Sequence, residues 1–266
     1  MKNLRVILIL SISILWSSCS TNEDLAPTED LSVKETALIE KVSTVADGYL
    51  LTQKKQEVFL ANKAKWWEIA LADVIGGAVG YLTGGPVGGV ILGVGCSVAA
   101  GVGIAPPNNT NGGVNNDNNV FDYAGIQHVS TLHTSLTRNR GVISEDGIFN
   151  PTSYLQLVNQ SYNSNLTIDQ YNYVQHYVDT ALTTTDELSV VFSNMGQERL
   201  LTTNESQVLT RYFQAFENTT NFYDFINFSV SIENIVQQSE ISVAEKNMLL
   251  FTMATARHDL NYWYQN

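Results

Sequence analysis

The chain is short of basic residues. It holds 14 Lys and Arg against 26 Asp and Glu, a formal net charge of -12 over 266 residues. A protein that binds nucleic acid needs a basic face to neutralise phosphates. We therefore expect no nucleic-acid partner, and the acidic balance suits a solvated protein surface.

The short motifs of common active sites and metal sites are missing as well. The sequence contains no HExxH, CxxC or DxDxDG spacing and no GxSxG nucleophile elbow. His128 and His133 are five residues apart, so they do not form the i, i+4 pair that binds a metal from one helix face. We expect them, with His176 and His258, to be helical residues with ordinary partners. The sequence thus predicts no catalytic residue, no metal site, no cofactor and no enzymatic activity.

Strand signals are absent, whereas helix signals are frequent. No Asn-Gly turn is flanked by alternating strands, and Asn150-Pro151 is typical of an N-cap followed by proline at the first helical position. Capping boxes open four segments with helical apolar spacing, so we predict an all-α fold. The boxes are Ser32–Glu35, Thr167–Gln170, Thr202–Glu205 and Ser242–Glu245. The stripe predicted for the last helix is Leu249, Met253, Ala256, Leu260 and Trp263.

Residues 74–116 contain no charged side chain, and eleven of the 18 glycines lie between Gly76 and Gly103. Glycines four residues apart share a helix face that another backbone can approach closely. Each interior glycine disfavours a helix by about 1 kcal/mol relative to alanine, so eleven cost roughly 10 kcal/mol. Such a helix needs a membrane or intimate packing. The glycines expected to pack are Gly76, Gly80, Gly84 and Gly88 in one series and Gly85, Gly89 and Gly93 in another.

The glycine-rich segment contains one proline, Pro86, directly after Gly84-Gly85. This break leaves limbs at residues 69–85 and 87–105, which hold 17 and 19 residues. At 1.5 Å rise per residue they are about 25 and 28 Å long, near the ~30 Å hydrocarbon core of a bilayer. We predict a helical hairpin, with Trp66-Trp67 at the height of an interface.

Three environments for this hairpin stay open. It is a packed centre of the soluble domain, a membrane-inserting or oligomerising element, or a flexible loop. Asp73 argues against deep insertion of the first limb's start, because a charge there costs a few kcal/mol. The repeated small-xxx-small spacing is similar to that of glycine-zipper bacteriocins, and this resemblance covers about 40 residues. It implies a membrane-active peptide segment.

The N-terminus has the parts of a signal peptide. Residues 1–5 are positively charged, residues 6–16 are apolar but too short to span a bilayer, and Ser17-Ser18 precedes Cys19. This pattern resembles the bacterial lipoprotein cleavage box, although Trp16 stands where that family usually has an aliphatic residue. The resemblance implies a signal peptide at 1–18 and a lipid-modified Cys19, whose several acyl chains, palmitate among them, give a stable membrane anchor.

Looser cleavage boxes of this kind are typical of Bacteroidota lipoproteins, and the acidic residues 20–24 look like the export signal of that group. The resemblance implies an outer-membrane lipoprotein exposed at the cell surface. With Cys19 acylated, the second cysteine, Cys96, has no partner for an intramolecular disulfide. We expect Cys96 to be a small apolar packing residue.

The order of parts follows from these patterns. An acidic tether occupies 19–31, and a helix running to about Lys65 together with the hairpin occupies 32–105. Pro, Asn and Gly mark a linker at 106–120. A helical domain occupies 121–266.

The ends of the last region carry the remaining patterns. Segments 123–128 and 257–264 look like the opening and closing segments of a group of Bacteroidota lipoproteins with a glycine-rich segment before a helical domain. The aromatic residues there either pack in the core or line a groove for a peptide or glycan. Asp179-Thr180-Ala181 matches the short Bacteroidota O-glycosylation pattern, which makes Thr180 a candidate modification site.

These observations predict a lipid-anchored cell-surface lipoprotein with a non-enzymatic structural or interaction role. The hairpin is its packing or oligomerisation element, and self-association through it is one expected partnership. The alternative is a membrane-active, bacteriocin-like protein that acts on neighbouring cells. The sequence does not identify a protein or glycan partner.

Overall fold

The computed structural model describes residues 28–53, 65–102, 114–138, 141–185, 187–219 and 221–264. Nine α-helices and no extended strand lie within these ranges, which confirms the predicted all-α class; Ile143 and Phe149 form an isolated antiparallel bridge. The helices are α2 (Thr28–Thr52), α3 (Lys65–Ala100), α4 (Asp122–Arg138), α5 (Pro151–Tyr162), α6 (Ile168–Thr184), α7 (Leu188–Gln197), α8 (Thr203–Glu217), α9 (Phe222–Gln238) and α10 (Val243–Tyr264).

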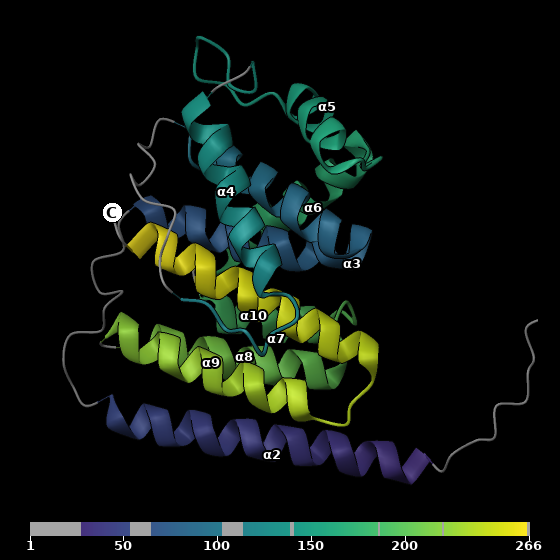
Figure 1. The fold of residues 1–266 in the computed structure, drawn as a ribbon, viewed down its shortest axis with the longest axis vertical. Helices are drawn as coiled ribbons and strands as arrows, with labels where there is room; N and C mark the ends of the chain where they lie inside the picture. Colours follow the sequence, from purple (N-terminus) through teal and green to yellow (C-terminus); the bar gives the residue numbers. More distant parts are fainter. Residues whose placement is uncertain are drawn as a thin grey trace, which may run out of the picture.

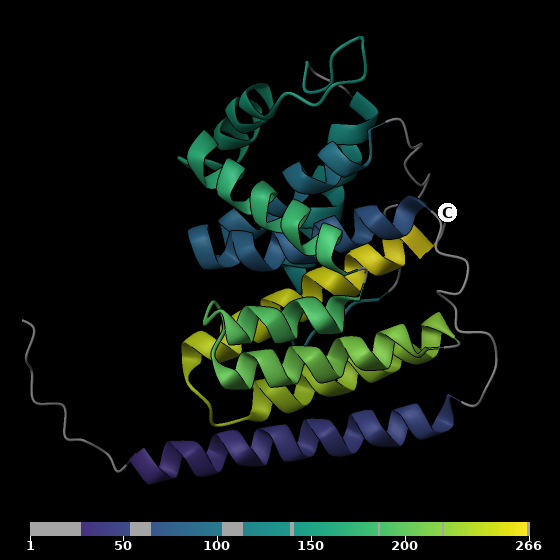
Figure 2. The ribbon, with the colours of Figure 1, turned by 180° about the vertical axis from the view of Figure 1, so that it is seen from behind.

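Helix α10 lies between two groups of helices (Figures 1 and 2). α3 and α4 pack on one side of it, and α8 and α9 pack on the other. α2 lies along α8 and α9 at one edge of the molecule, while α5 and α6 contact α3 toward the opposite edge. Buried apolar residues from α2 through α10 form one cluster. The regions expected at 32–105 and 121–266 therefore share a single core.

The central position of α10 buries it on every side. Each residue from Met248 to Trp263 is buried, not only the predicted stripe. The apolar spacing in the sequence marks one face, but helices pack on both sides of α10, so its polar residues are enclosed too. The expectation of a single buried stripe was too narrow.

Helix α3 is a hairpin of two helical limbs. Its backbone leaves helical geometry at Gly84 (φ -146°, ψ 17°) and Gly85 (φ 64°, ψ -161°), directly before Pro86. The second limb then runs back along the first: a Cβ atom on Gly80 would lie 2.7 Å from the carbonyl oxygen of Gly88. The two limbs are thus in backbone contact, and only glycine fits at this crossing.

The expected glycine series are interrupted at the turn. Gly84 and Gly85 make no contact between the limbs: a Cβ on Gly85 would meet nothing within 4 Å, and one on Gly84 would meet only a Leu166 methyl. Position 85 requires glycine because its φ is positive, a conformation that other residues rarely adopt. Gly84 packs against Leu166 and not against the other limb, so the prediction of a packing glycine was wrong only for Gly85.

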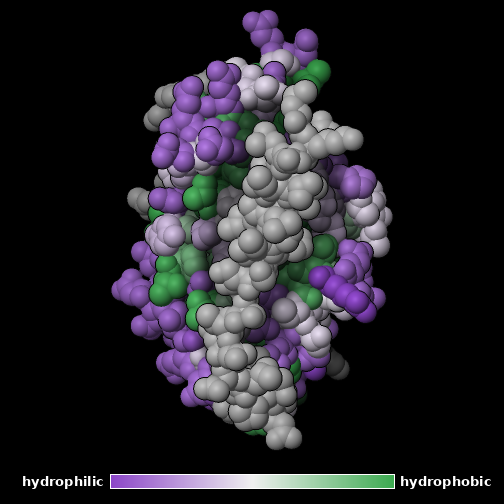
Figure 3. Space-filling view, turned by 90° about the vertical axis from the view of Figure 1, so that its right-hand side faces the viewer, coloured by the Kyte–Doolittle hydropathy of each residue, from purple (hydrophilic) through white to green (hydrophobic). Residues whose placement is uncertain are grey.

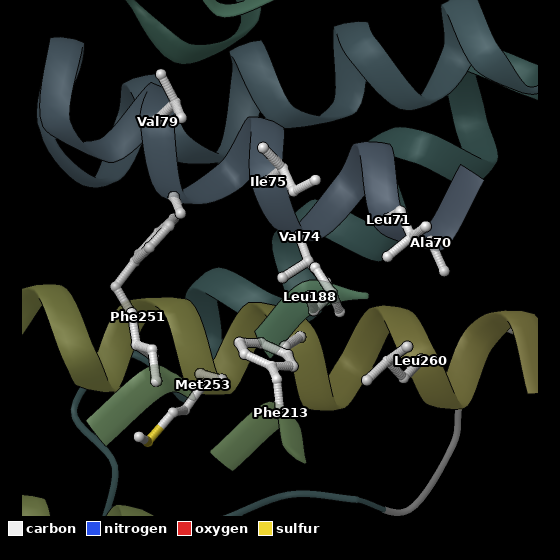
Figure 4. Packing of buried hydrophobic residues seen from close by; sticks show 14 of the residues in the cluster. Ala70, Leu71, Val74, Ile75, Val79, Leu188, Phe213, Phe251, Met253 and Leu260 are labelled. Atoms are coloured by element: carbon white, nitrogen blue, oxygen red, sulfur yellow. The ribbon is translucent and has the colours of Figure 1, made fainter. Parts of the chain in front are cut away.

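Both limbs are covered by other helices. Phe251 of α10 reaches up to the hairpin (Figure 4), where its ring occupies the place of a Cβ on Gly89. On the other side, the rings of Tyr154 and Tyr171 lie against Gly95, and the Tyr154 hydroxyl donates to the Ile91 carbonyl oxygen at 2.7 Å. The hairpin therefore occupies the interior of the helical body.

The local helix signals have mixed outcomes. Asn150 and Thr167 cap α5 and α6 as expected, the box at Thr202 caps α8, and Ser242 accepts from the Glu245 backbone N–H at the start of α10. The box at Ser32 does not begin a helix. α2 starts at Thr28, so the helix takes in the last residues of the expected tether.

The sequence itself favours the earlier start. Glu29 and Asp30 follow Thr28 in the sequence, and negative charge is favourable in the first turn of a helix. α2 ends at Thr52. Its expected continuation to Lys65 lies largely outside the described residues, as do the side chains of Trp66 and Trp67.

The limb crossing can be tested with a pair of glycine-to-alanine changes. Gly80→Ala places a methyl group against the Gly88 backbone, which cannot move without parting the limbs. We expect the free energy of unfolding to fall by about 1–3 kcal/mol. Gly48→Ala, on α2, meets nothing within 4 Å and should raise it by up to about 1 kcal/mol. Equal effects of both changes in denaturant unfolding would contradict the backbone contact.

Candidate functional site

A buried polar cluster lies where the hairpin meets α4 and α10. Its centre is Asp73, the last charged residue before the charge-free segment, whose side chain is fully buried. Oδ1 of Asp73 accepts hydrogen bonds from Ser97 Oγ on the second limb and from His128 Nε2 on α4, the latter at 2.8 Å. Oδ2 accepts from Trp263 Nε1 on α10 at 3.0 Å. One carboxylate thus joins both limbs to two neighbouring helices.

A second carboxyl group completes this cluster. Asp259 Oδ2 lies 3.6 Å from His128 Nε2, and both side chains are fully buried. Neither oxygen of Asp259 has a hydrogen-bond partner among the described residues, and the same holds for His128 Nδ1. Burial, reinforced by the nearby Asp73 carboxylate, raises the pKa of Asp259 well above its ordinary value. We call Asp73, Ser97, His128, Asp259 and Trp263 the Asp73 cluster.

Glycines make room for the two histidines of this region. A Cβ on Gly93 would lie 2.8 Å from His128 Cε1, so the imidazole rests on the bare helix backbone. On α4, a Cβ on Gly125 would lie 2.5 Å from His258 Cδ2 and 2.7 Å from the Ala254 carbonyl oxygen. Gly93 therefore does more than pack against the first limb, which was its expected role.

A second buried cluster includes Arg257, two residues before Asp259 on α10. Arg257 is fully buried and pairs with Glu233 of α9, Nε to Oε1 at 2.7 Å and Nη2 to Oε2 at 3.0 Å. Nη2 also lies 2.7 Å from Asp122 Oδ1, which His258 Nε2 approaches to 3.0 Å. These four residues, with Asn116 and Asn119, form what we call the Arg257 cluster.

Part of the expected linker belongs to the Arg257 cluster. Asn116 and Asn119 are buried, and their amide groups donate to Glu233 Oε2 at 3.0 and 2.8 Å. Val114 offers its carbonyl oxygen to Arg257. Residues 114–120 are non-helical as predicted, but their asparagines hold the chain to α9 and α10. The composition of this segment predicted a loop. It could not predict the contacts of these asparagines with Glu233, because those partners are distant in the sequence.

The other sequence-predicted residues are more scattered. Thr180 is exposed on α6, and its hydroxyl donates to the His176 carbonyl oxygen at 2.8 Å. His133 Nδ1 lies 3.1 Å from the Tyr262 hydroxyl, and His176 is exposed. Cys19 lies outside the described residues.

The aromatic residues near the end of the chain pack inward. Tyr262 and Trp263 are buried in the core, which removes both from any groove for a peptide or glycan. Tyr123, at the opening of α4, is exposed. The interpretation that these segments pack in the core therefore holds for Tyr262 and Trp263.

The Asp73 cluster contains the residue types of a hydrolytic triad but not the arrangement. The Ser97 hydroxyl donates to Asp73 and to the Gly93 carbonyl oxygen, whereas a nucleophilic serine needs its histidine as proton acceptor. The whole cluster is buried. What the group can do is hold a proton or a cation between two carboxyl groups and an imidazole.

A pocket of about 340 Å³ lies between α4 and α5, away from both clusters. Hydroxyl groups and a few apolar side chains form its walls, which suits a neutral ligand, and none of the lining residues within the described ranges is charged. Its lining residues are Ser130, Thr131, Thr134, Ser135, Val142, Leu157, Val158, Ser161 and Tyr162.

Comparison of the chain with protein-family models, with curated proteins and with solved structures gave no match. The resemblances to lipoproteins and to glycine-zipper bacteriocins therefore stay predictions.

The Arg257 cluster predicts a specific loss of stability in acid. Burial raises the pKa of Asp122, but hydrogen bonds from His258 and Arg257 and their charges outweigh it and lower the pKa from 3.8 to about 2. Because the folded-state pKa is depressed, Asp122 stabilises the fold above about pH 4, and this contribution is lost as the pH falls toward 2.

The test is Asp122→Asn, which removes that titration. Guanidinium midpoints measured from about pH 5 to 2 should fall less steeply in this variant than in the unaltered chain. The exposed Asp117→Asn, on the same segment, is the control and should follow the unaltered chain. An unchanged slope for Asp122→Asn would refute the assignment.

Proposed function

We propose that the protein is a lipid-anchored outer-membrane lipoprotein, exposed at the cell surface, with a structural or interaction role and no enzymatic activity. The lipid on Cys19 supplies the membrane attachment, and the helical body is the part presented to partners. The glycine hairpin acts as the packing centre of that body. The sequence pattern that ends at Cys19 supports the anchor. The observation that carries the packing role is the buried Asp73, which ties the hairpin to α4 and α10.

The limb crossing supports an internal role for the hairpin. Gly80 and Gly88 face each other across the limbs, so this contact is already occupied within one chain. Among the hairpin side chains that the structure describes, the exposed large apolar ones are Leu82 and Val87 near the turn, each 41% exposed. Self-association through the hairpin would therefore use its turn and not its glycine faces.

The alternative is a membrane-active protein, and one feature favours it. Glu68–Ala100 is long and apolar enough to cross a membrane by length and composition, as the core helix of a soluble protein also can be. Most of its apolar window is buried. Where Figure 3 shows residues that are not grey, hydrophobic ones form small separate groups among hydrophilic ones. Membrane insertion would thus require the hairpin to leave its place among α4, α6 and α10.

The rate at which a reagent labels the Cys96 thiol measures whether the hairpin leaves its place in the fold. Its thiol is fully buried in the second limb, and burial raises its pKa. In the full chain carrying Cys19→Ser, we expect a thiol reagent to label Cys96 at least about 1000-fold more slowly than in the unfolded chain. Asp73→Asn should speed labelling because it weakens the hydrogen bonds that hold the hairpin, while Glu68→Gln, exposed on the same limb, should not.

The same labelling experiment with added liposomes distinguishes the structural role from the membrane-active alternative. If the hairpin is a packing element, vesicles will neither speed Cys96 labelling nor release a trapped dye. Fast labelling with vesicles together with dye release would establish the membrane-active alternative and end the structural proposal.

The anchor itself has a direct test. Cells that express the full chain and are fed labelled palmitate should yield a labelled protein, and Cys19→Ala should abolish the label. Cys96→Ala is the matched control and should keep it, because Cys96 is buried in the fold. A label that persists in Cys19→Ala would rule out the anchor at this residue.

A further inference from the structure

We propose that Asp73, His128 and Asp259 bind one divalent transition-metal cation, such as Zn²⁺, as a structural site. The sequence predicted no metal site, and the proposal stands apart from the lipoprotein function. The three residues come from α3, α4 and α10, and one ligand atom of each lies within 4.8 Å of the other two.

The distances suit a shared ion. His128 Nε2 lies 2.8 Å from Asp73 Oδ1 and 3.6 Å from Asp259 Oδ2. Ligand atoms about 2.1 Å from a tetrahedral Zn²⁺ lie about 3.4 Å from one another. To share one ion, the 2.8 Å pair would have to widen and the 3.6 Å pair to close slightly.

Asp259 points to a missing partner. It is fully buried, yet neither of its oxygens has a hydrogen-bond donor within the described part of the chain. A buried polar group without a partner is costly and rare in proteins. A cation bound between Asp259 and His128 would supply the interaction that the protein itself does not.

Charge balance selects the kind of cation. The cluster holds two carboxyl groups and one imidazole, while the nearby Arg257 is taken up by Glu233 and Asp122. A divalent ion with two carboxylates and a neutral imidazole forms a neutral group, which a buried site favours. Mixed oxygen and imidazole ligands suit Zn²⁺ and neighbouring first-row metals. For Nε2 of a neutral His128 to bind the ion, the ring proton would have to lie on Nδ1, and any proton held by Asp259 would be released.

Hydrogen bonds already orient the carboxylate of one ligand, Asp73. Trp263 Nε1 donates to Asp73 Oδ2 at 3.0 Å, and Ser97 donates to Oδ1. Such outer contacts position the ligating carboxylates of metal sites. Because the whole cluster is buried, the ion would have to enter before the helices close around it, so binding would be coupled to folding.

The experiment refolds the full chain carrying Cys19→Ser from guanidinium, either with Zn²⁺ or with EDTA. After removal of free metal, we expect one Zn²⁺ per chain by elemental analysis. The thermal midpoint should be about 5–10 °C higher than that of the chain refolded with EDTA.

Asp259→Asn is the decisive variant, because the amide keeps the size of the side chain and should fold. It should retain less than a tenth of the Zn²⁺ and show no difference in midpoint between the two refolding conditions. His128→Gln should also lose the ion, whereas His176→Gln, at an exposed position on α6, should keep it. No retained Zn²⁺ in the unaltered chain, or equal retention in Asp259→Asn, would overturn the proposal.

Discussion

The buried carboxylate of Asp73 is the constraint on which the interior of this fold depends. A carboxylate in an apolar interior is unfavourable unless donors surround it. Here the donors arrive from three separate places, Ser97 on the second limb, His128 on α4 and Trp263 on α10. A surface of glycine and valine would allow many ways of packing the hairpin. A satisfied buried polar group selects one of them.

The glycines of the hairpin serve two structural purposes, and their four-residue spacing does not distinguish between them. Gly80 and Gly88 let the limbs touch along their backbones, while Gly89, Gly93 and Gly95 leave space for the rings of Phe251, His128 and two tyrosines. Large rings placed against bare backbone bury much apolar area. This burial counters the cost of the helical glycines in the two limbs, about 1 kcal/mol for each relative to alanine.

Features that depend on neighbouring residues, such as turns and helix caps, could be predicted from the sequence. Contacts between residues distant in the sequence could not. The turn at Pro86 and the cap at Thr167 follow from a few adjacent residues, so the sequence indicated both. The hydrogen bonds of Asp73 to His128 and Trp263 span 55 and 190 positions, and no local spacing reveals them. The polar residues of α10 were outside the predicted apolar stripe. They are buried because helices also pack on that face.

A membrane and the protein interior offer the hairpin different contacts. The contact between Gly80 and Gly88 would persist in lipid, so the glycine spacing does not distinguish the two environments. Asp73 does, since in lipid it would keep only Ser97 from its own hairpin, and a charge costs up to about 2.5–3.5 kcal/mol as it approaches the centre of a bilayer. Departure of the hairpin would also expose the rings that now cover it, Phe251 among them, to water. Both terms favour the interior, and a lipid at Cys19 would then leave the hairpin no part in membrane attachment.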